Sequence, residues 1–307
     1  MRQSNPGLGS SFKWRAGGED GGRALDAVVS AWLKVPLGEA AALIDFGSVY
    51  VGGRIERNPA RTLAGGEEIS VSFPAHGVRK FYEVDPARIL FRDRFLLAYD
   101  KEPGIPSQQT PSDAYNNLFA ALLRYLEKEG GPGPYAALHH RLDMETSGVM
   151  LFALDKEVNR ALGAAFEKKR VRKEYLAWVE GVPGMDEWTE DSNIGKSGGR
   201  YGTARRGEGR TAVTVFRALH RERDRALVLA QPLTGRTHQI RIHLAARGHP
   251  VVGDRAHGAK TAARLFLHAF RLSLKHPANQ RPLILEAPLP PEWPLPPGLA
   301  LPPARPA

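Results

Sequence analysis

Residues 139–155 read HHRLDMETSGVMLFALD, a short polar loop that runs into an unbroken apolar segment. The run Val149–Leu154 has no polar alternation, which predicts a strand buried on both faces of a sheet. Asp155 then suits the N-cap of the following helix. Asp143 lies instead on the loop that enters the buried strand. A carboxylate on a rigidly anchored loop is a candidate functional group, although an Asp beside an Arg is also common in turns and ion pairs.

The segments around this strand indicate the fold class. Short strand-like runs such as RFLLAYDK, YLAWVEG, TAVTVFRAL and ALVLAQPL outnumber helical patterns, and no regular βαβ repeat is present. This order predicts an α+β domain with a mixed, largely antiparallel sheet over residues 82–293. Residues 294–307, PLPPGLALPPARPA, are expected to form a disordered or extended proline-rich tail.

A second constellation is PLTGRTHQIRIHLAARGHP, residues 232–250. Thr237 suits an N-cap and Gly248 a C′ position, which predicts a short helix. His238 and Arg241 are three residues apart and project together from it. A metal site built from His238 and His243 is disfavoured, because residues five apart lie about 140° apart around a helix.

The N-terminal part predicts a separate module over residues 22–75, after a disordered tail over residues 1–21. Two amphipathic helices are followed by short strands at Val49–Val51 and Ile69–Phe73. This order, with ALIDFGSVYVGGR at its centre, resembles the small α/β-type RNA-binding module shared by ribosomal protein S-four and many RNA-modifying enzymes. A purely structural mini-domain is the alternative, since residues 1–78 carry 8 basic and 8 acidic side chains. RNA contacts here would have to come from individual residues such as Arg23 and Arg54.

The charge is concentrated in one window. Its Gly/Arg-rich part, GKSGGRYGTARRGEGR, has no hydrophobic periodicity and is expected to be an irregular, mobile basic loop. Between Ile194 and Lys260 there are 14 Lys and Arg against 4 Asp and Glu, which accounts for the net charge of +10. A solvated basic face is one interpretation, but clustered basic residues favour a polyanionic partner, nucleic acid before membrane. The chain has no cysteine, no signal-like start and no long apolar run. These features exclude thiol chemistry and favour a cytoplasmic protein with no membrane association.

Three segments together resemble a known family. HRLDMETSG, KEYLAWVEG and GRTHQIRIHLAARGHPVVGD are similar to signature segments of RluA-type pseudouridine synthases, over roughly residues 89–293. One departure is the turn Lys101-Glu102-Pro103-Gly104, where the family usually has Lys-Pro-x-Gly. The resemblance implies the pseudouridine synthase fold and the isomerisation of uridine in ribosomal or transfer RNA. It also implies that Asp143 is the essential carboxylate, with Tyr175 and Arg241 beside it.

The chemistry fits those residue types. Breaking a C–N glycosidic bond, turning the uracil and rejoining it through carbon can use one carboxylate, as nucleophile or as proton acceptor at the sugar. Arg241 would hold Asp143 ionised, and Tyr175 would stack on the uracil and help to move its C5 proton. The target uridine must be flipped out of its helix, and Arg141 is a candidate to fill the gap. Further RNA contacts are expected from His140, Arg236, His238, Lys196, Arg205, Arg206 and Arg210.

The reaction is redox-neutral, so we expect no cofactor and no metal, and a monomer that acts on RNA. Ribosomal RNA is favoured, with transfer RNA as the alternative. Two other functions stay open: a non-catalytic RNA-binding ribosome assembly factor, and a metal-dependent hydrolase using His139, His140, Asp143 and His238. The hydrolase would lose its activity to a chelator.

Overall fold

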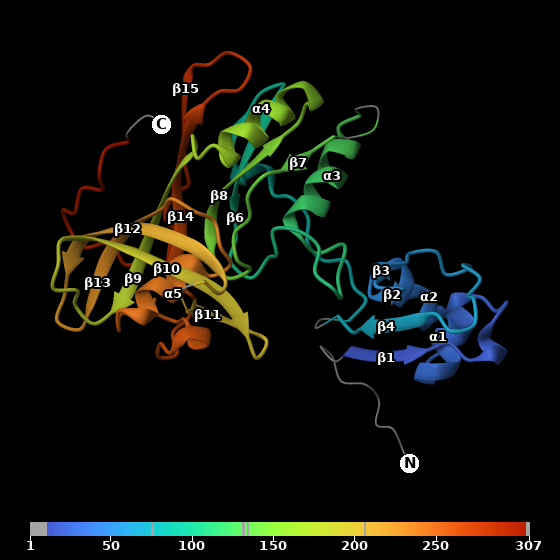
Figure 1. The fold of residues 1–307 in the computed structure, drawn as a ribbon. Coiled ribbons are helices and arrows are strands. Elements are labelled where there is room, and N and C mark those ends of the chain that lie inside the picture. The colour runs from blue at the N-terminus through green and yellow to red at the C-terminus, as the bar shows by residue number, and fades with distance from the viewer. Residues whose placement is uncertain (1–10, 75–76, 131–132, 134, 206, 305–307) are drawn as a thin grey trace. The chain divides into compact units, whose positions relative to one another are not determined.

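The computed structural model describes residues 11–74, 77–130, 133, 135–205 and 207–304 of the 307-residue chain. Its contacts divide the chain into two compact units (Figure 1). The first unit comprises Met1–Val84 and Gln108–Gly131, and the second comprises Asp85–Ser107 and Pro132–Ala307. The chain thus leaves the first unit and later returns to it. This division differs from the predicted one, in which a single boundary separates residues 22–75 from residues 82–293.

The first unit contains a four-stranded sheet and three α-helices among its described residues, and two of these helices share one apolar core with the sheet. The strand order is β1-β4-β2-β3, and all pairs are antiparallel. The predicted amphipathic helices are confirmed, because Leu25, Val28 and Val29 of the first and Leu43 and Ile44 of the second are buried in that core. The elements are β1 (Ser11–Arg15), η1 (Gly18–Asp20), α1 (Leu25–Leu33), α2 (Leu37–Asp45), β2 (Val49–Val51), β3 (Arg54–Ile55), β4 (Glu68–Ser72) and α3 (Leu118–Lys128).

Strand β1 lies inside the segment predicted as a disordered tail, residues 1–21. It pairs with β4 from Ser11 opposite Ser72 to Arg15 opposite Glu68. The tail prediction is therefore wrong for Ser11–Arg15, while residues 1–10 lie outside the described part of the chain. The sequence concealed this strand because Trp14 alone among its five residues is buried, so no apolar alternation is visible.

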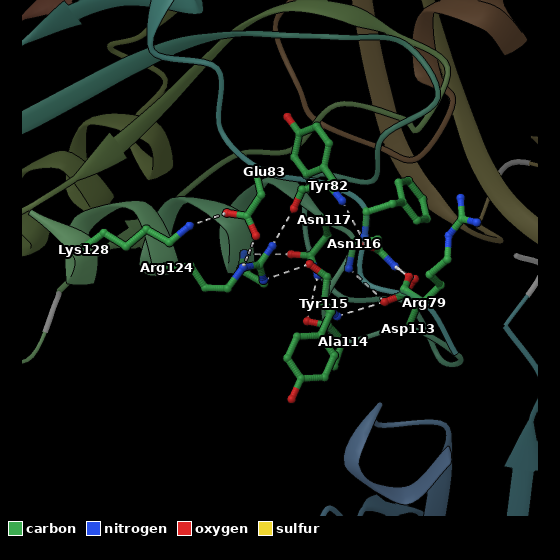
Figure 2. Close-up of polar contacts among 12 residues, drawn as sticks. Arg79, Tyr82, Glu83, Asp113, Ala114, Tyr115, Asn116, Asn117, Arg124 and Lys128 are labelled. Atoms are coloured by element: carbon green, nitrogen blue, oxygen red, sulfur yellow. Dashed lines mark hydrogen bonds and ion pairs between the residues drawn. The ribbon is translucent and has the colours of Figure 1, made fainter. Parts of the chain in front are cut away.

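The returning segment is tied to the linker that precedes the second unit (Figure 2). The Asn116 amide oxygen accepts hydrogen bonds from the backbone N–H groups of Phe81 and Tyr82 at 2.8 and 3.2 Å, and its nitrogen donates to the Arg79 carbonyl. Arg124 of α3 donates to the Tyr82 carbonyl at 2.6 Å. These bonds satisfy backbone groups of the linker that no regular structure would satisfy.

The second unit is built on an eleven-stranded sheet with the path β11-β10-β12-β13-β9-β14-β8-β6-β5, to which β15 and β7 are added at β14 and β8. Among the described strands, every pairing is antiparallel except that of β14 with β8. The predicted mixed, largely antiparallel α+β fold is confirmed. The strands are β5 (Ile89–Arg92), β6 (Leu96–Lys101), β7 (Ala137–Leu138), β8 (Ser147–Ala153), β9 (Arg172–Glu180), β10 (Glu187–Ser197), β11 (Arg200–Ala204), β12 (Arg210–Arg221), β13 (Arg225–Pro232), β14 (Leu267–Lys275) and β15 (Pro282–Glu286).

Two α-helices and two short 3₁₀ turns complete this unit. They are α4 (Lys156–Glu167), α5 (Gln239–Ala246), η2 (Pro86–Arg88) and η3 (Arg255–His257). Helix α4 contacts β8, and α5 contacts strands β10 to β13 (Figure 1). Asp155 caps α4 by accepting a hydrogen bond from the Glu157 N–H at 2.6 Å, as the sequence predicts.

Strand β8 is buried at all seven positions, which confirms the predicted core strand. It starts two residues earlier than the apolar run, at Ser147. Gly148 there has a φ of 115°, and a Cβ at this position would lie 2.2 Å from the Ala269 carbonyl oxygen of β14. Only glycine fits such a conformation and such an approach. The parallel contact between β8 and β14 therefore depends on Gly148.

The basic segment after Ile194 is more ordered than predicted. It was expected to be an irregular loop, but β10 and β11 form a hairpin with Lys196 opposite Tyr201. Gly198 and Gly199 form its turn with φ values of 55° and 83°. Consecutive left-handed residues match a two-residue hairpin turn, so the glycine pair was the signal for two strands rather than for a loop.

Helix α5 begins one residue later than predicted. His238, not Thr237, is its N-cap, and it adopts a left-handed φ of 55°. Gly248 has a φ of 79°, as expected for the predicted C′ glycine.

The proline-rich segment after Trp293 is extended and held against the second unit as far as it is described. The Trp178 indole donates to the Pro294 carbonyl at 2.9 Å, and Arg271 donates to the Pro302 carbonyl at 3.0 Å. Residues 305–307 lie outside the described residues. Elsewhere, no single described helix is long and apolar enough to cross a bilayer, and the one helix pair that passes by length and composition, α1 with α2, is bent by 116°.

Candidate active site

Asp143 is held in place through the backbone on both sides of it. The Ser107 hydroxyl donates to the Leu142 carbonyl at 2.7 Å and accepts from the Leu142 N–H at 3.0 Å. The Met144 carbonyl accepts from the Gly104 N–H at 2.8 Å and from Lys101 Nζ at 3.1 Å. The segment after β6 therefore fixes both neighbours of Asp143, which leaves its side chain little freedom to move.

Lys101 is fully buried, which is rare for a lysine. Besides Met144, its ammonium group donates to the carbonyls of Glu102 and Ile105 at 2.7 and 2.8 Å. Burial lowers the pKa of Lys101 to about 7. Three carbonyl oxygens nevertheless match the three N–H donors of the ammonium form, so the group serves as a structural clamp.

Arg241 connects Asp143 to the core of the second unit. Its Nη1 donates to Asp143 Oδ2 at 3.3 Å. On its other edge, Nε and Nη2 each donate to one oxygen of Asp254 at 2.7 Å, and the Asp254 side chain is completely buried. A two-bond carboxylate contact fixes the plane of a guanidinium. The predicted pairing of Arg241 with Asp143 is thus present, with Asp254 as its support.

His238 also faces Asp143. Its Nε2 lies 4.0 Å from Asp143 Oδ2, and its Nδ1 lies 3.0 Å from Nε2 of His257. Burial lowers the pKa of His238, and the charge of Arg241 acts in the same direction, although Asp143 opposes it. The imidazole is therefore neutral around pH 7 and can accept a proton.

Tyr175 lies on β9, opposite Ala230 of β13. Burial raises the pKa of its phenol well above the ordinary value, and the negative charge of Asp143 raises it further. The phenol therefore stays protonated and uncharged beside the carboxylate. It offers an aromatic face and one hydroxyl, which suits it to hold a flat uncharged base.

Arg141 and Arg236, both predicted to contact RNA, border the site. Arg141 is exposed, and its Nη2 lies 3.4 Å from the Thr237 hydroxyl. Arg236 is partly exposed and donates to the Thr211 carbonyl at 3.1 Å. His140 is placed differently: its Nε2 accepts from the Leu151 N–H at 2.9 Å, and burial lowers its pKa to about 3. This imidazole serves the packing of the loop, and its placement does not support the predicted RNA contact.

The other predicted RNA contacts lie on strands β10 to β12 of the second unit and in the first unit. Lys196 is exposed on the β10–β11 hairpin, Arg205 is exposed directly after β11, and Arg210 is exposed as the first residue of β12. Arg206 lies outside the described residues. In the first unit, Arg54 is exposed on β3, whereas Arg23 pairs with Asp20 at 3.3 Å.

A metal centre is not evident. Within the described residues, no group of three or more His, Asp or Glu side chains could hold an ion. Of the residues considered for a hydrolase, His139 contacts Asn159 at 2.6 Å and His140 contacts the β8 backbone, so neither faces Asp143.

The sequence interpretation missed four residues of this arrangement: Lys101, Ser107, Asp254 and His257. Asp254 ends the segment GRTHQIRIHLAARGHPVVGD, and a carboxylate in the same segment as Arg241 was the available signal. Ser107 and His257 carried none, because nothing in their local sequence shows that they approach residues 35 and 19 positions away.

Comparisons with known proteins identify the same family that the sequence motifs resemble. Residues 95–246 match a family model described as RNA pseudouridylate synthase. An uncharacterized RNA pseudouridine synthase of Zymomonas mobilis is 35% identical over 214 residues, covering 66% of this chain and 94% of the relative. The ribosomal large subunit pseudouridine synthase C of Yersinia pestis is 31% identical over 302 residues, covering 88% and 90%. The human RNA pseudouridylate synthase domain containing 4 superposes with a TM-score of 0.57 at 27% identity, covering 67% of this chain and 89% of that one.

Proposed function

The chain belongs to the RNA pseudouridylate synthase family, whose members isomerise uridine in RNA, and we propose from this premise that it acts on large-subunit ribosomal RNA with Asp143 as the catalytic carboxylate. The observation that carries the proposal is the chain of contacts from buried Asp254 through Arg241 to Asp143. It presents one carboxylate, paired with a guanidinium, on a loop held at both sides, which is the group that this isomerisation needs.

The reaction breaks the C–N glycosidic bond, turns the uracil over and rejoins it to the ribose through carbon. Asp143 acts at the ribose, as nucleophile at C1′ or as proton acceptor at the sugar. Arg241 holds that carboxylate in position through the 3.3 Å hydrogen bond. Tyr175 keeps the detached uracil in place with its ring, and its protonated phenol adds no charge that would repel Asp143.

A uridine inside a helix must be flipped out to reach Asp143, at a cost of a few kcal/mol. Arg141 is exposed, two residues before Asp143. We propose that its side chain fills the gap that the flipped base leaves in the helix. The basic side chains of the β10–β11 hairpin, with Arg205 and Arg210, then hold phosphates without reading sequence.

Ribosomal RNA is favoured over transfer RNA by two similar proteins. The relatives from Yersinia pestis and Xanthomonas campestris, both 31% identical and both aligned over 88% of this chain, are named ribosomal large subunit pseudouridine synthases C and D. We further propose that residues 22–75, which resemble the S-four module, bind RNA and that Arg54 takes part. The exposed position of Arg54 on β3 supports this role.

The experiment is tritium release from transcripts that carry [5-³H]uridine. The parent protein is expected to release tritium from large-subunit ribosomal RNA and not from transfer RNA, with or without EDTA. The D143N variant is expected to release none. D155N is the matched control, because Asn also caps helices well and Asp155 only caps α4. Release from transfer RNA alone would overturn the substrate, and activity of D143N would overturn the role of Asp143.

A further inference from the structure

His238 occupies a position that ordinary packing does not explain. It is the N-cap of α5, yet its side chain makes no capping bond and its backbone is left-handed at a φ of 55°. Such conformations are unfavourable for residues other than glycine and cluster at functional sites. This conformation is associated with an imidazole whose Nε2 lies 4.0 Å from Asp143 Oδ2.

His257 defines which nitrogen of His238 is free. The His238 Nδ1 and His257 Nε2 are 3.0 Å apart, so one of them donates to the other. When Nδ1 of His238 carries the hydrogen, its Nε2 lone pair is directed toward the Asp143 side. His257 lies on η3, directly after Asp254, which holds Arg241. Residues 254–257 therefore position both partners of Asp143. Asp254 holds the cationic Arg241, and His257 holds the neutral His238.

We propose that His238 is a further catalytic residue, the general base that removes the proton from C5 of the rotated uracil, and that His257 is a positioning residue that holds it in the required tautomer. The inference rests on the proposed role of Asp143. It adds the removal of the C5 proton, a step that the proposed role of Asp143 at the ribose does not include.

Proton removal follows the formation of the new carbon–carbon bond. Once C5 of the uracil is bonded to C1′ of the ribose, C5 carries both the new bond and its original hydrogen. The C5–H bond then breaks, its electron pair restores the C5–C6 double bond, and the proton goes to Nε2 of His238. At the same time the π pair of the C6–N1 double bond, which formed when C5 attacked the ribose, returns to N1, and N1 takes up a proton from water. The resulting imidazolium is stabilised by the Asp143 carboxylate and loses its proton to water after the RNA leaves, since the His238 side chain is 28% exposed.

The other groups around Asp143 are less suited to accept this proton. Arg241 is always protonated. Tyr175 is a neutral phenol whose pKa is raised by burial and by Asp143, so its basic form is scarce. Asp143 acts at the ribose in the preceding steps, and in this step its carboxylate is the counter-charge of the imidazolium, 4.0 Å from His238 Nε2. Burial lowers the pKa of His238, which keeps it in the neutral form that a base requires. A positioned general base contributes roughly 10²- to 10⁴-fold to a rate.

The test uses H238N, because Asn tolerates a left-handed backbone better than most residues. On ribosomal RNA with ordinary uridine, pseudouridine formation by H238N should fall ~10²-fold or more. On RNA with [5-²H]uridine, H238N should slow further through a primary isotope effect that the parent does not show. On RNA with 5-fluorouridine, which has no C5 proton, glycosidic cleavage and rejoining should proceed equally in H238N and the parent.

A second variant separates chemistry from structure. H238G removes the imidazole at a backbone position that glycine accepts freely, and added imidazole should restore part of its rate. H257Q should show a smaller loss with the same isotope effect, and H220Q on β12 should behave like the parent. The role of His238 as a base would be overturned if H238N lost the same rate on uridine RNA and on 5-fluorouridine RNA and showed no isotope effect. It would also be overturned if H238N only bound RNA more weakly. A parent protein inactive on every RNA would instead refute the proposed function.

Discussion

Arg241 and Asp254 form a buried ion pair in which two nitrogens of one group donate to two oxygens of the other at 2.7 Å. Arg241 retains a third nitrogen for Asp143, and it is 5% exposed. The orientation of the proposed catalytic carboxylate, Asp143, therefore depends on Asp254, an acid whose side chain is completely buried.

D254N tests this dependence. The change keeps the shape of the side chain but removes the buried counter-charge of the Arg241 guanidinium, and breaking a buried ion pair typically costs about 3–5 kcal/mol. We expect the free energy of unfolding to fall by about that amount and kcat to fall more than RNA affinity. Urea denaturation and single-turnover kinetics measure the two effects. The R241Q/D254N double variant should be more stable than the sum of the single changes implies, and simple additivity would show that the pair is not coupled.

S107A tests the backbone clamp on the catalytic loop. The variant loses both hydrogen bonds between Ser107 and Leu142, so we expect a loss of roughly 1–3 kcal/mol in stability and a lower kcat, with RNA binding unchanged. S273A on β14 is the matched control, because the described residues offer its buried hydroxyl no hydrogen-bond partner. Equal losses of kcat in both variants would contradict the clamp.

G148A tests the close approach of β8 and β14. The added methyl would lie 2.2 Å from the Ala269 carbonyl oxygen, in a backbone conformation with a φ of 115°. We expect destabilisation by about 3 kcal/mol or more, visible as a lower melting temperature. A methyl group added at Gly184 would meet no atom within 4 Å, so G184A should melt within a few degrees of the parent. A stable G148A would show that the two strands can separate without loss.

Two histidines with strongly lowered pKa values predict acid sensitivity. Burial lowers the pKa of His140 to about 3 and that of His268 to about 4. Above about pH 6.5 both folded and unfolded forms are neutral, so stability does not change. As pH falls below 6.5, the unfolded chain binds protons that the folded chain does not bind, and each histidine removes up to about 1.4 kcal/mol per pH unit.

This acid sensitivity can be measured by urea denaturation between pH 7 and pH 4.5. H140Q should show a shallower decline than the parent, because one of the histidines that folding keeps neutral is gone. H220Q, which changes a partly exposed histidine on β12, should retain the parent slope. If stability declined with pH equally in all three proteins, His140 would not be a source of the acid sensitivity.

The sequence predicted those parts of the molecule whose signal is local. The run Val149–Leu154, the cap at Asp155 and the glycine at 248 each rely on neighbouring residues, and the structure has all three. Strand β1 was missed because its pairing partner is more than fifty residues away and Trp14 is its only buried residue. Burial against a distant strand leaves no trace in a short polar segment.

The candidate site divides in the same way. Asp143 and Arg241 were found through short motifs, and their contact is present. The residues that hold them in place, Ser107 and Asp254, were not found. They become informative only when the fold brings Ser107 to Leu142 and Asp254 to Arg241. His140 stands in the same motif as Asp143, yet it turns toward β8, a direction that motif position alone does not define.

The return of residues 108–131 to the first unit affects how this protein could be dissected or could have been assembled. Ala114 donates to the Phe46 carbonyl at 3.0 Å, and the ring of Tyr115 lies 3.7 Å from Lys80 Nζ. A deletion that ends near residue 80 would therefore remove one half of a folded body and leave its other half inside the remaining polypeptide. The N-terminal region therefore cannot be exchanged as one continuous segment. A deletion of the whole first unit would have to remove residues 1–84 and residues 108–131 and join Ser107 to Pro132.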